Sequence, residues 1–397
     1  MAAYEFRAPS RILTGSGSAL RVGGAIHATG ARHIMVVSDP FILAGHAPQA
    51  VITALTNSGL RVTIFDRVDG EPTVRVVDAA HAAAVEAGVD GIVGLGGGSA
   101  MDVAKAVAIL ATHGGPLVRF EGADRVPLRR LPLACIATTA GTGSEATRYV
   151  IVTDEARDRK MLISTWECLP DIAVADPDLT RDVPTRAVVA AGIDAFTHAL
   201  EAYVSRRAQP LTDGLALHAI RRIVPALPRV VGDPSDDQAR EAMSIGALEA
   251  GIAFANASVA LVHGMARPLG ARFRVAHGLA NAVLLPTACA WSWPAAPSRY
   301  RDLGVAMGAV ADADTSPEEG ARATVHAIAQ LCEKVGVPSM AGLGVEADAY
   351  AAAIPAMSID ALASGSPANN PRVPDAAELE DLYRTAYTAV LGSVTPR

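Results

Sequence analysis

Short apolar runs rich in β-branched residues alternate with helical stretches over about the first 180 residues. Between the runs, residues 48–58 and 73–88 carry apolar side chains at helical spacing. Strand–helix–strand alternation of this kind is typical of a parallel sheet with helices packed on its faces. The runs predict buried strands at residues 33–38, 61–65, 91–95, 131–137 and 149–153.

The pattern changes after residues 177–180 (PDLT), where long Ala-rich segments with helical spacing begin. Pro225, Pro228 and Pro234 are expected to separate these helices, because proline ends most helices. No strand is predicted from residue 186 onward.

The predicted fold class is therefore an α/β, Rossmann-like parallel-sheet N-terminal domain followed by an all-helical C-terminal domain. We place the first domain at residues 1–182 and the second at residues 183–397. A chain of 397 residues, of which 50% are hydrophobic, can bury two such cores.

Charge and cysteine content limit the partners that we expect. The formal net charge of −7 argues against a nucleic-acid partner, because a phosphate-binding surface needs clustered Lys and Arg. The four cysteines form no CxxC pair, as in the reduced thiols of an intracellular protein. The first residues lack the pattern of a signal peptide, and no apolar run reaches about 18 residues. We therefore expect a cytoplasmic protein that binds neither nucleic acid nor a membrane.

A glycine-rich turn lies between a predicted strand and a helix that runs through residues 101–105. It consists of Gly96, Gly97, Gly98 and Ser99. Glycines let backbone N–H groups come close to a ligand, and a helix N-terminus offers unpaired donors and a positive dipole end. The turn thus suits a pyrophosphate, although a tight structural turn would have the same composition. The usual G-x-G-x-x-G after the first strand is absent.

A second loop, residues 138–145 (TTAGTGSE), follows another predicted strand and is dense in hydroxyls and glycines. Two such loops at the carboxyl ends of parallel strands lie at the same edge of a sheet, where ligands bind. Asp39 directly follows the first predicted strand and would either accept hydrogen bonds from a ribose diol or cap a helix. In the first role its carboxylate would repel a 2′-phosphate, which favours NAD over NADP.

A candidate metal site comes from the second half of the chain. Asp194 and His198 are four residues apart in a helical stretch, so they share one helix face. His263 and His277 follow, each preceding a glycine. One carboxylate and three imidazoles suit Fe(II), Zn(II), Co(II) or Mn(II) and leave positions open for a substrate. His218 has no partner at such spacing and is assigned to packing.

With these features the chain resembles the iron-containing, or group III, alcohol dehydrogenase family over essentially its whole length. The resemblance implies an N-terminal dinucleotide-binding domain, a helical metal-binding domain, a cleft between them, and the fold shared with dehydroquinate synthase. The segments that carry it are 96–105 (GGGSAMDVAK), 137–145 (ATTAGTGSE), 170–180 (PDIAVADPDLT), 192–205 (GIDAFTHALEAYVS), 253–286 (AFANASVALVHGMARPLGARFRVAHGLANAVLLP) and 370–372 (NPR).

The resemblance also implies roles for single residues. It implies that Asp194, His198, His263 and His277 ligate iron, or zinc in some members. Phe254 and Tyr149 look like pocket lining. Contacts with NAD are implied for Asp39, Gly96, Gly97, Gly98, Ser99, Asp102, Thr138, Thr139, Thr142, Lys160 and Leu179.

One position departs from the family's pattern. Arg267 stands where many members have a second histidine, which is often credited with proton transfer near the substrate. Arginine does not deprotonate usefully in proteins, so Arg267 cannot relay a proton and no catalytic side chain is assigned. It would either hold a carboxylate, for instance on the substrate, or form a structural ion pair at a helix end. Arg148 is a second candidate for holding a carboxylate.

These features predict a metal-dependent, NAD(H)-linked alcohol dehydrogenase or aldehyde reductase that acts on a small primary alcohol or its aldehyde. One alternative is a reductase of a carboxylated aldehyde or keto acid, similar to maleylacetate reductase. Others are a non-redox lyase on the same scaffold and a silent nucleotide-binding protein. We expect a homodimer or a higher homo-oligomer, since the family commonly pairs through N-terminal strands and residues 4–7 would supply one.

Overall fold

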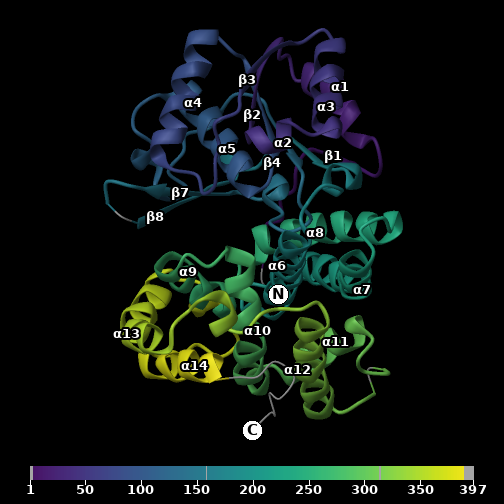
Figure 1. The fold of residues 1–397 in the computed structure, drawn as a ribbon, viewed down its shortest axis with the longest axis vertical. Coiled ribbons are helices and arrows are strands. Elements are labelled where there is room, and N and C mark those ends of the chain that lie inside the picture. Colours follow the sequence, from purple (N-terminus) through teal and green to yellow (C-terminus); the bar gives the residue numbers. More distant parts are fainter. Residues whose placement is uncertain (1–2, 158, 313, 389–397) are drawn as a thin grey trace. The chain divides into compact units, whose positions relative to one another are not determined.

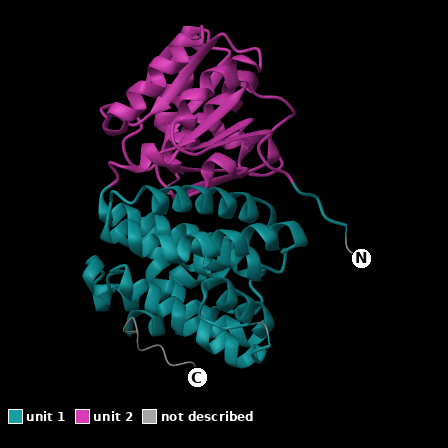
Figure 2. Cartoon of the chain, turned by 90° about the vertical axis from the view of Figure 1, so that its right-hand side faces the viewer, with its two compact units in different colours: residues 1–6, 184–397 teal, residues 7–183 magenta. Residues whose placement is uncertain are grey.

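The computed structural model describes residues 3–157, 159–312 and 314–388. The chain divides into two compact units (Figure 2). The first unit along the chain, magenta and keyed as unit 2 in Figure 2, is Arg7–Val183. The second unit, teal and keyed as unit 1, comprises the described residues of Met1–Phe6 and Pro184–Arg397. The short N-terminal segment thus packs with the helical part of the chain, where Gln209 Nε2 donates to the Glu5 carbonyl at 2.9 Å.

Six parallel strands form the main sheet of the first unit, in the order β1-β9-β6-β4-β2-β3. Together with the helical second unit, this sheet confirms the predicted fold class. The sequence analysis missed β1 and β9, because runs of only four residues carry little periodicity. The strands are β1 (Arg11–Thr14), β2 (His33–Ser38), β3 (Arg61–Phe65), β4 (Gly91–Gly96), β6 (Leu133–Ala137) and β9 (Ile172–Ala175).

Helices cover both faces of this sheet (Figure 1). Successive side chains on a strand point to opposite faces, so Ile34 and Val36 of β2 pack with α1 and α3, whereas Met35 and Val37 pack with α4 and α5. Burial on both faces explains why these strands are continuous apolar runs. The helices of this unit are α1 (Val22–His27), α2 (Pro40–Leu43), α3 (His46–Asn57), α4 (Val74–Ala87) and α5 (Gly98–His113), with short 3-10 turns η1 (Ser18–Arg21), η2 (Leu117–Phe120), η3 (Ser144–Ala146), η4 (Trp166–Cys168) and η5 (Pro177–Thr180).

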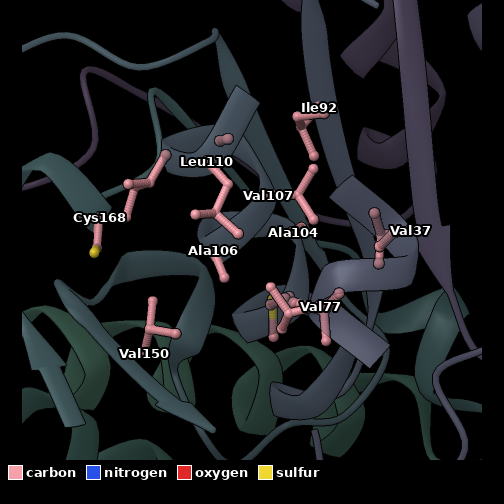
Figure 3. Packing of buried hydrophobic residues seen from close by; sticks show 14 of the residues in the cluster. Val37, Val77, Ile92, Ala104, Ala106, Val107, Leu110, Val150 and Cys168 are labelled. Atoms are coloured by element: carbon pink, nitrogen blue, oxygen red, sulfur yellow. The ribbon is translucent and has the colours of Figure 1, made fainter. Parts of the chain in front are cut away.

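A second sheet corrects one prediction. Residues 149–153 were expected to join the parallel sheet, but they form β7 (Tyr149–Asp154), which pairs antiparallel with β8 (Arg159–Ser164). The short β5 (Gly122–Ala123) completes a three-stranded sheet in the order β5-β8-β7. Val150 of β7 belongs to the same apolar cluster as the residues of α5 (Figure 3). Helix α5 is therefore covered by both sheets, which explains its apolar composition.

All the regular secondary structure among the described residues of the second unit is helical, as predicted. Pro225 and Pro228 were expected to separate helices, but both lie inside α7. A proline removes one backbone hydrogen bond, and packing of α7 against α6 and α8 outweighs that loss. The helices are α6 (Thr185–Val204), α7 (Pro210–Gly232), α8 (Asp237–Ala257), α9 (Leu261–Phe273), α10 (His277–Ser292), α11 (Pro297–Met307), α12 (Pro317–Lys334), α13 (Ala347–Ala363) and α14 (Ala376–Thr388), with 3-10 turns η6 (Trp293–Ala295), η7 (Ala341–Leu343) and η8 (Pro367–Asn369).

Helix α6 is the central helix of this unit. By length and composition it could cross a membrane, and the α8–α9 pair passes the same test as one bent span. However, 78% of the apolar window of α6 is buried inside the protein, as in the core helix of a globular domain. Its buried face also carries charged and imidazole groups, which leads to the candidate site.

Candidate metal centre and nucleotide loops

Helix α6 presents three polar side chains on one buried face. Asp194, His198 and Glu201 follow one another at spacings of four and three residues, which places them on one side of an α-helix. All three are buried, and an ionisable group is rarely buried without a partner. Their partners come from α9 and α10.

The start of each partner helix supplies one histidine. His263 is the third residue of α9, which begins after a bend of 102° from α8. His277 is the first residue of α10. The next residue, Gly278, packs directly on the α6 backbone, since a Cβ there would lie 2.2 Å from the carbonyl oxygen of Ala190. Only glycine permits this approach, which brings His277 beside α6 one turn before Asp194.

The four residues predicted as ligands converge on one carboxylate oxygen. The Nε2 atoms of His198, His263 and His277 lie 3.8, 3.4 and 3.7 Å from Asp194 Oδ1. Three of the four, Asp194, His263 and His277, form a group whose ligand atoms all lie within 4.8 Å of one another, and His198 is not a member of that group. These distances leave room for a divalent cation between the donors after small side-chain adjustments.

Two further polar residues of this centre were missed by the sequence analysis. Glu201 Oε2 lies 2.6 Å from His263 Nδ1, and Asn281 Nδ2 donates to Asp194 Oδ1 at 2.7 Å. Spacing could have indicated both, because Glu201 is three residues after His198 and Asn281 is four after His277. The Asn281 Oδ1 atom is buried and has no hydrogen-bond partner among the described residues. The Nδ2 atom of Asn281 also lies 3.2 Å from His263 Nε2 and 3.4 Å from His277 Nε2, so the amide group contacts three of the predicted ligands.

The electrostatics of the centre favour bound positive charge. Burial acts to raise the pKa of Asp194, but the nearby imidazoles of His198, His277 and His263 outweigh it. The pKa of Asp194 therefore lies below its ordinary value, and the group is a carboxylate. Burial acts to lower the pKa of His263, and the carboxylates of Glu201 and Asp194 raise it instead.

An aromatic ring stacks on one of the imidazoles of the centre. The ring of Phe254, near the end of α8, stacks on His198 with centroids 4.1 Å apart and planes 13° from parallel. His198 in turn stacks on His263 at 4.6 Å. The predicted role of Phe254 as pocket lining is not tested by these contacts, but they place it against a candidate ligand. Tyr149 belongs to β7 of the other unit.

Three of the predicted cofactor contacts lie at one edge of the main sheet. Asp39, Gly97 and Thr138 follow the carboxyl ends of β2, β4 and β6, which are neighbouring parallel strands. Ser38 Oγ donates to the Leu95 carbonyl at 2.6 Å and the Thr138 amide to the Gly96 carbonyl at 3.0 Å, which holds the strand ends in register. This edge is where ligands of parallel sheets bind.

The glycine-rich turn leads directly into α5. Gly97 is its N-cap and supplies no side-chain hydrogen bond, so the first amides of the helix remain available. A Cβ on Gly98 would lie 3.2 Å from the Thr142 side chain, and the nearest atom to one on Gly97 would be Thr139 Oγ1 at 3.8 Å. Ser99 is half-buried in the first turn. The Thr138 hydroxyl is buried without a hydrogen-bond partner within the described ranges.

Other predicted cofactor residues have structural partners. Asp39 caps α2, accepting from the amides of Phe41 and Ile42 at 2.6 and 3.3 Å through Oδ1. Lys160 lies on β8, where its ammonium pairs with Glu71 at 2.7 Å. Leu179 is buried in the apolar cluster under α1 and α3.

Asp102 and Lys105 form a buried polar cluster on α5. Lys105 Nζ donates to Ser144 Oγ, Thr147 Oγ1 and the Tyr149 carbonyl at 2.8, 3.1 and 3.0 Å. Asp102 accepts from Ser144 Oγ at 2.8 Å and lies 3.8 Å from Lys105 Nζ. Burial raises the pKa of Asp102 despite the nearby ammonium. This cluster joins α5 to the second loop, so Asp102 has a structural role whether or not it touches a cofactor.

Glu145 gives this loop a pH-dependent stability. Its side chain is buried, with Oε2 lacking a hydrogen-bond partner in the described structure, and burial raises its pKa from 4.5 to about 7. Between these two pH values the unfolded chain loses the proton and the folded chain keeps it, so stability falls as pH rises. We expect Glu145→Gln to stabilise the protein by up to about 3 kcal/mol at pH 8 and to change little at pH 4.5.

Urea unfolding of both proteins at these two pH values measures the effect. Glu155→Gln, at a half-exposed carboxylate paired with Arg75, is the matched control and should show no such pH dependence. Equal stability of Glu145→Gln and the parent chain at pH 8 would contradict the buried, raised-pKa assignment.

The structure also places the two arginines singled out in the sequence and the histidine that was assigned to packing. Arg267 lies inside α9, not at its end, and donates to Ser366 Oγ at 3.0 Å, a contact that decides between neither of its two predicted roles. Arg148 stacks over the rings of Trp166 and Tyr149. His218 was assigned to packing, but its half-exposed ring pairs with Glu249 at 2.7 Å, because it lies on the outer face of α7.

Fold and site together define a class of protein, a parallel-sheet α/β unit joined to a helical unit with an Asp/His candidate metal centre. Residues 9–177 match the iron-containing alcohol dehydrogenase family, and residues 188–387 match the C-terminal region of that family. The chain belongs to the iron-containing alcohol dehydrogenase family, as predicted, and is an oxidoreductase.

Individual relatives cover nearly the whole chain. The 1,3-propanediol dehydrogenase of Citrobacter freundii is 35% identical over 388 residues, which cover 97% of this chain and 99% of the relative. The NAD-dependent methanol dehydrogenase of Bacillus methanolicus is 31% identical over 383 residues, covering 96% and 99%. The crystal structure of a 1,3-propanediol oxidoreductase matches with a TM-score of 0.93 and 34% identity, covering 97% of this chain and 100% of that chain.

Proposed function

We propose that this alcohol dehydrogenase is metal-dependent and NAD(H)-linked, and that it interconverts a small primary alcohol and its aldehyde. The observation that carries the proposal is the convergence of three imidazole Nε2 atoms on Asp194 Oδ1. One carboxylate and three imidazoles match the preferences of Fe(II), with Zn(II) as the other candidate.

Asp194, His198, His263 and His277 would hold the cation. When bound, the cation supplies Lewis acidity that stabilises negative charge on the substrate oxygen. The protein's own part is to orient these donors and to exclude water. Burial of Asp194 and His263 and the stacked ring of Phe254 give the centre a low-dielectric wall, in which electrostatic interactions are stronger.

The nicotinamide cofactor would carry the hydride, and the edge formed by β2, β4 and β6 would bind it. Available amides at the start of α5 suit its pyrophosphate. The orphaned Thr138 hydroxyl is a further donor at the same edge. The name of the Bacillus methanolicus relative, NAD-dependent, supports NAD as the cofactor. Asp102, Thr139, Thr142, Lys160 and Leu179 stay predicted contacts.

The test of this function is NADH consumption by the purified chain, loaded anaerobically with Fe(II) or with Zn(II). Short, branched and aromatic aldehydes, each paired with a carboxylated analogue where one exists, would be compared. We expect metal-dependent consumption with the uncharged aldehydes. A preference for the carboxylated analogues would favour substrate binding by Arg267, and no consumption with any carbonyl would contradict the proposal.

Asp39 is expected to set the preference for NADH over NADPH. Asparagine also caps helices, so Asp39→Asn removes the charge while keeping the cap of α2. A repulsion of about 1 kcal/mol between a carboxylate and a 2′-phosphate corresponds to roughly fivefold in kcat/KM. We therefore expect the NADH/NADPH ratio of kcat/KM to fall by roughly that factor. An unchanged ratio would remove Asp39 from this role.

We also propose a cytoplasmic location and a homodimeric or larger assembly. All four cysteines are free and buried, which suits a reducing compartment. The six-stranded sheet leaves β1 at one edge, where a second copy could pair. Light scattering coupled to size-exclusion chromatography tests the assembly, and a monomer would contradict it.

A further inference from the structure

We propose that Glu201 is a positioning residue that fixes the tautomer and the orientation of His263 for the cation, and that it also holds the start of α9. The inference rests on the proposed metal-dependent function. It concerns a residue outside the predicted ligand set, on the same face of α6 as Asp194 and His198.

The two oxygens of Glu201 serve two different donors. Oε2 lies 2.6 Å from His263 Nδ1, and Oε1 accepts from the backbone amide of Val262 at 2.6 Å. That amide belongs to the first turn of α9, whose N-cap residue Ala260 provides no side-chain hydrogen bond. The Glu201 carboxylate, 1% exposed, therefore caps α9 and also contacts the side chain of His263, the third residue of that helix.

The contact determines which nitrogen of His263 carries the proton. An ionised carboxylate only accepts hydrogen bonds, so Nδ1 must be the protonated nitrogen of the neutral ring. Nε2 then keeps its lone pair and faces Asp194 Oδ1 at 3.4 Å. In the other tautomer, Nε2 would carry a hydrogen toward the centre and could not ligate a cation.

An amide cannot replace this carboxylate. Glutamine offers one acceptor oxygen, whereas Val262 N–H and His263 Nδ1–H are two donors. If the amide oxygen in the Glu201→Gln variant stays on the backbone N–H of Val262, its NH2 group faces Nδ1 and drives the ring to the wrong tautomer. If the oxygen faces Nδ1 instead, the backbone N–H meets another donor and α9 loses its cap. Either arrangement disturbs His263.

The helical unit contains a matched control. Glu249 of α8 lies 2.7 Å from Nδ1 of His218 of α7, which is the same kind of Glu–His pair at a half-exposed site. Glu249 and His218 are not members of the Asp/His group of the metal centre. Glu249→Gln removes an equal charge beside an imidazole without touching a candidate ligand.

The experiment compares the parent chain, Glu201→Gln and Glu249→Gln by Zn(II) affinity, measured in competition with a chromophoric chelator. The ring-nitrogen shifts of 15N-labelled histidine in the metal-free proteins, recorded at alkaline pH so that the ring is neutral, report the tautomer, with His263→Ala used to assign the signal. We expect Glu201→Gln to weaken Zn(II) binding by about 10- to 100-fold and to change the His263 signal. Glu249→Gln should leave both unchanged.

Wild-type Zn(II) affinity and an unchanged His263 signal in Glu201→Gln would overturn the proposal. An equal loss of Zn(II) affinity in Glu249→Gln would also overturn it. So would a Glu201→Gln protein that binds Zn(II) normally and only unfolds at a lower temperature, because Glu201 would then have a structural role alone. If Glu201→Gln fails to fold, Glu201→Asp replaces it, because the shorter carboxylate keeps both acceptors but retracts from His263. It should bind Zn(II) more weakly than the parent, and parental affinity would overturn the proposal.

Failure of the proposed function would give a different result. If the parent chain binds neither Zn(II) nor Fe(II), the metal-dependent function is wrong. The tautomer of His263 in the metal-free parent and in Glu201→Gln still decides whether Glu201 positions the ring.

Discussion

Replacing Asp194 with Asn is expected to remove the bound divalent ion and to lower kcat/KM about a thousandfold or more. Asp194 is the one carboxylate in the candidate group, and its Oδ1 faces three imidazole nitrogens within 3.8 Å. The isosteric amide keeps the shape and loses the charge. Lewis-acid stabilisation is worth several kcal/mol, and each 1.4 kcal/mol or so is tenfold in rate. Metal analysis after dialysis and NADH-linked turnover measure the two effects.

Asp302→Asn is the control for this variant. Asp302 is a carboxylate of the same unit that accepts from Tyr203 Oη at 2.9 Å and pairs with Arg301. It should retain metal and most activity. Full activity of a metal-free Asp194→Asn protein would contradict the proposed function.

The second large effect concerns stability. Replacing Lys105 with Met is expected to destabilise the first unit by about 3–5 kcal/mol, the usual cost of breaking a buried ion pair. The ammonium is fully buried, and its three hydrogen bonds hold the second loop and β7 to α5. Methionine fills a similar volume but leaves Asp102 without its cation. Urea unfolding at pH 7 measures the difference.

Lys160→Met is the matched control. Lys160 pairs with Glu71, whose side chain is 64% exposed, and exposed pairs contribute about 0–1 kcal/mol. A loss at Lys105 no larger than the loss at Lys160 would mean that the buried cluster is not a stability determinant.

Several features of the fold could be predicted from local pattern. The strand at residues 33–38 matches β2, and the helical spacing at 73–88 matches α4, Val74–Ala87. Residues 149–153 were predicted as a strand and are one, but in the wrong sheet. Periodicity reports that a segment is extended and half-buried, and it carries no information on which strand will be its partner.

The candidate site shows the same division. The spacing of Asp194 and His198 placed them on one helix face, because α-helix geometry relates such positions directly. Glu201 lies on that face too, but its proposed role comes from its contacts with Val262 and His263, which are about 60 residues away in the chain. The sequence allowed Asp39 either to bind a ribose diol or to cap a helix, and the structure contains the cap of α2.

The sequence by itself determined the two kinds of unit, the strand-to-helix loops and the residue types of the candidate centre, because these follow from periodicity and from local chemistry. Only the tertiary structure decided that His263 and His277 meet Asp194, that Gly278 lets α10 touch α6, and that Lys105 is buried against the second loop and the start of β7. Such contacts join residues far apart in the chain, and they depend on packing that no short stretch of sequence specifies.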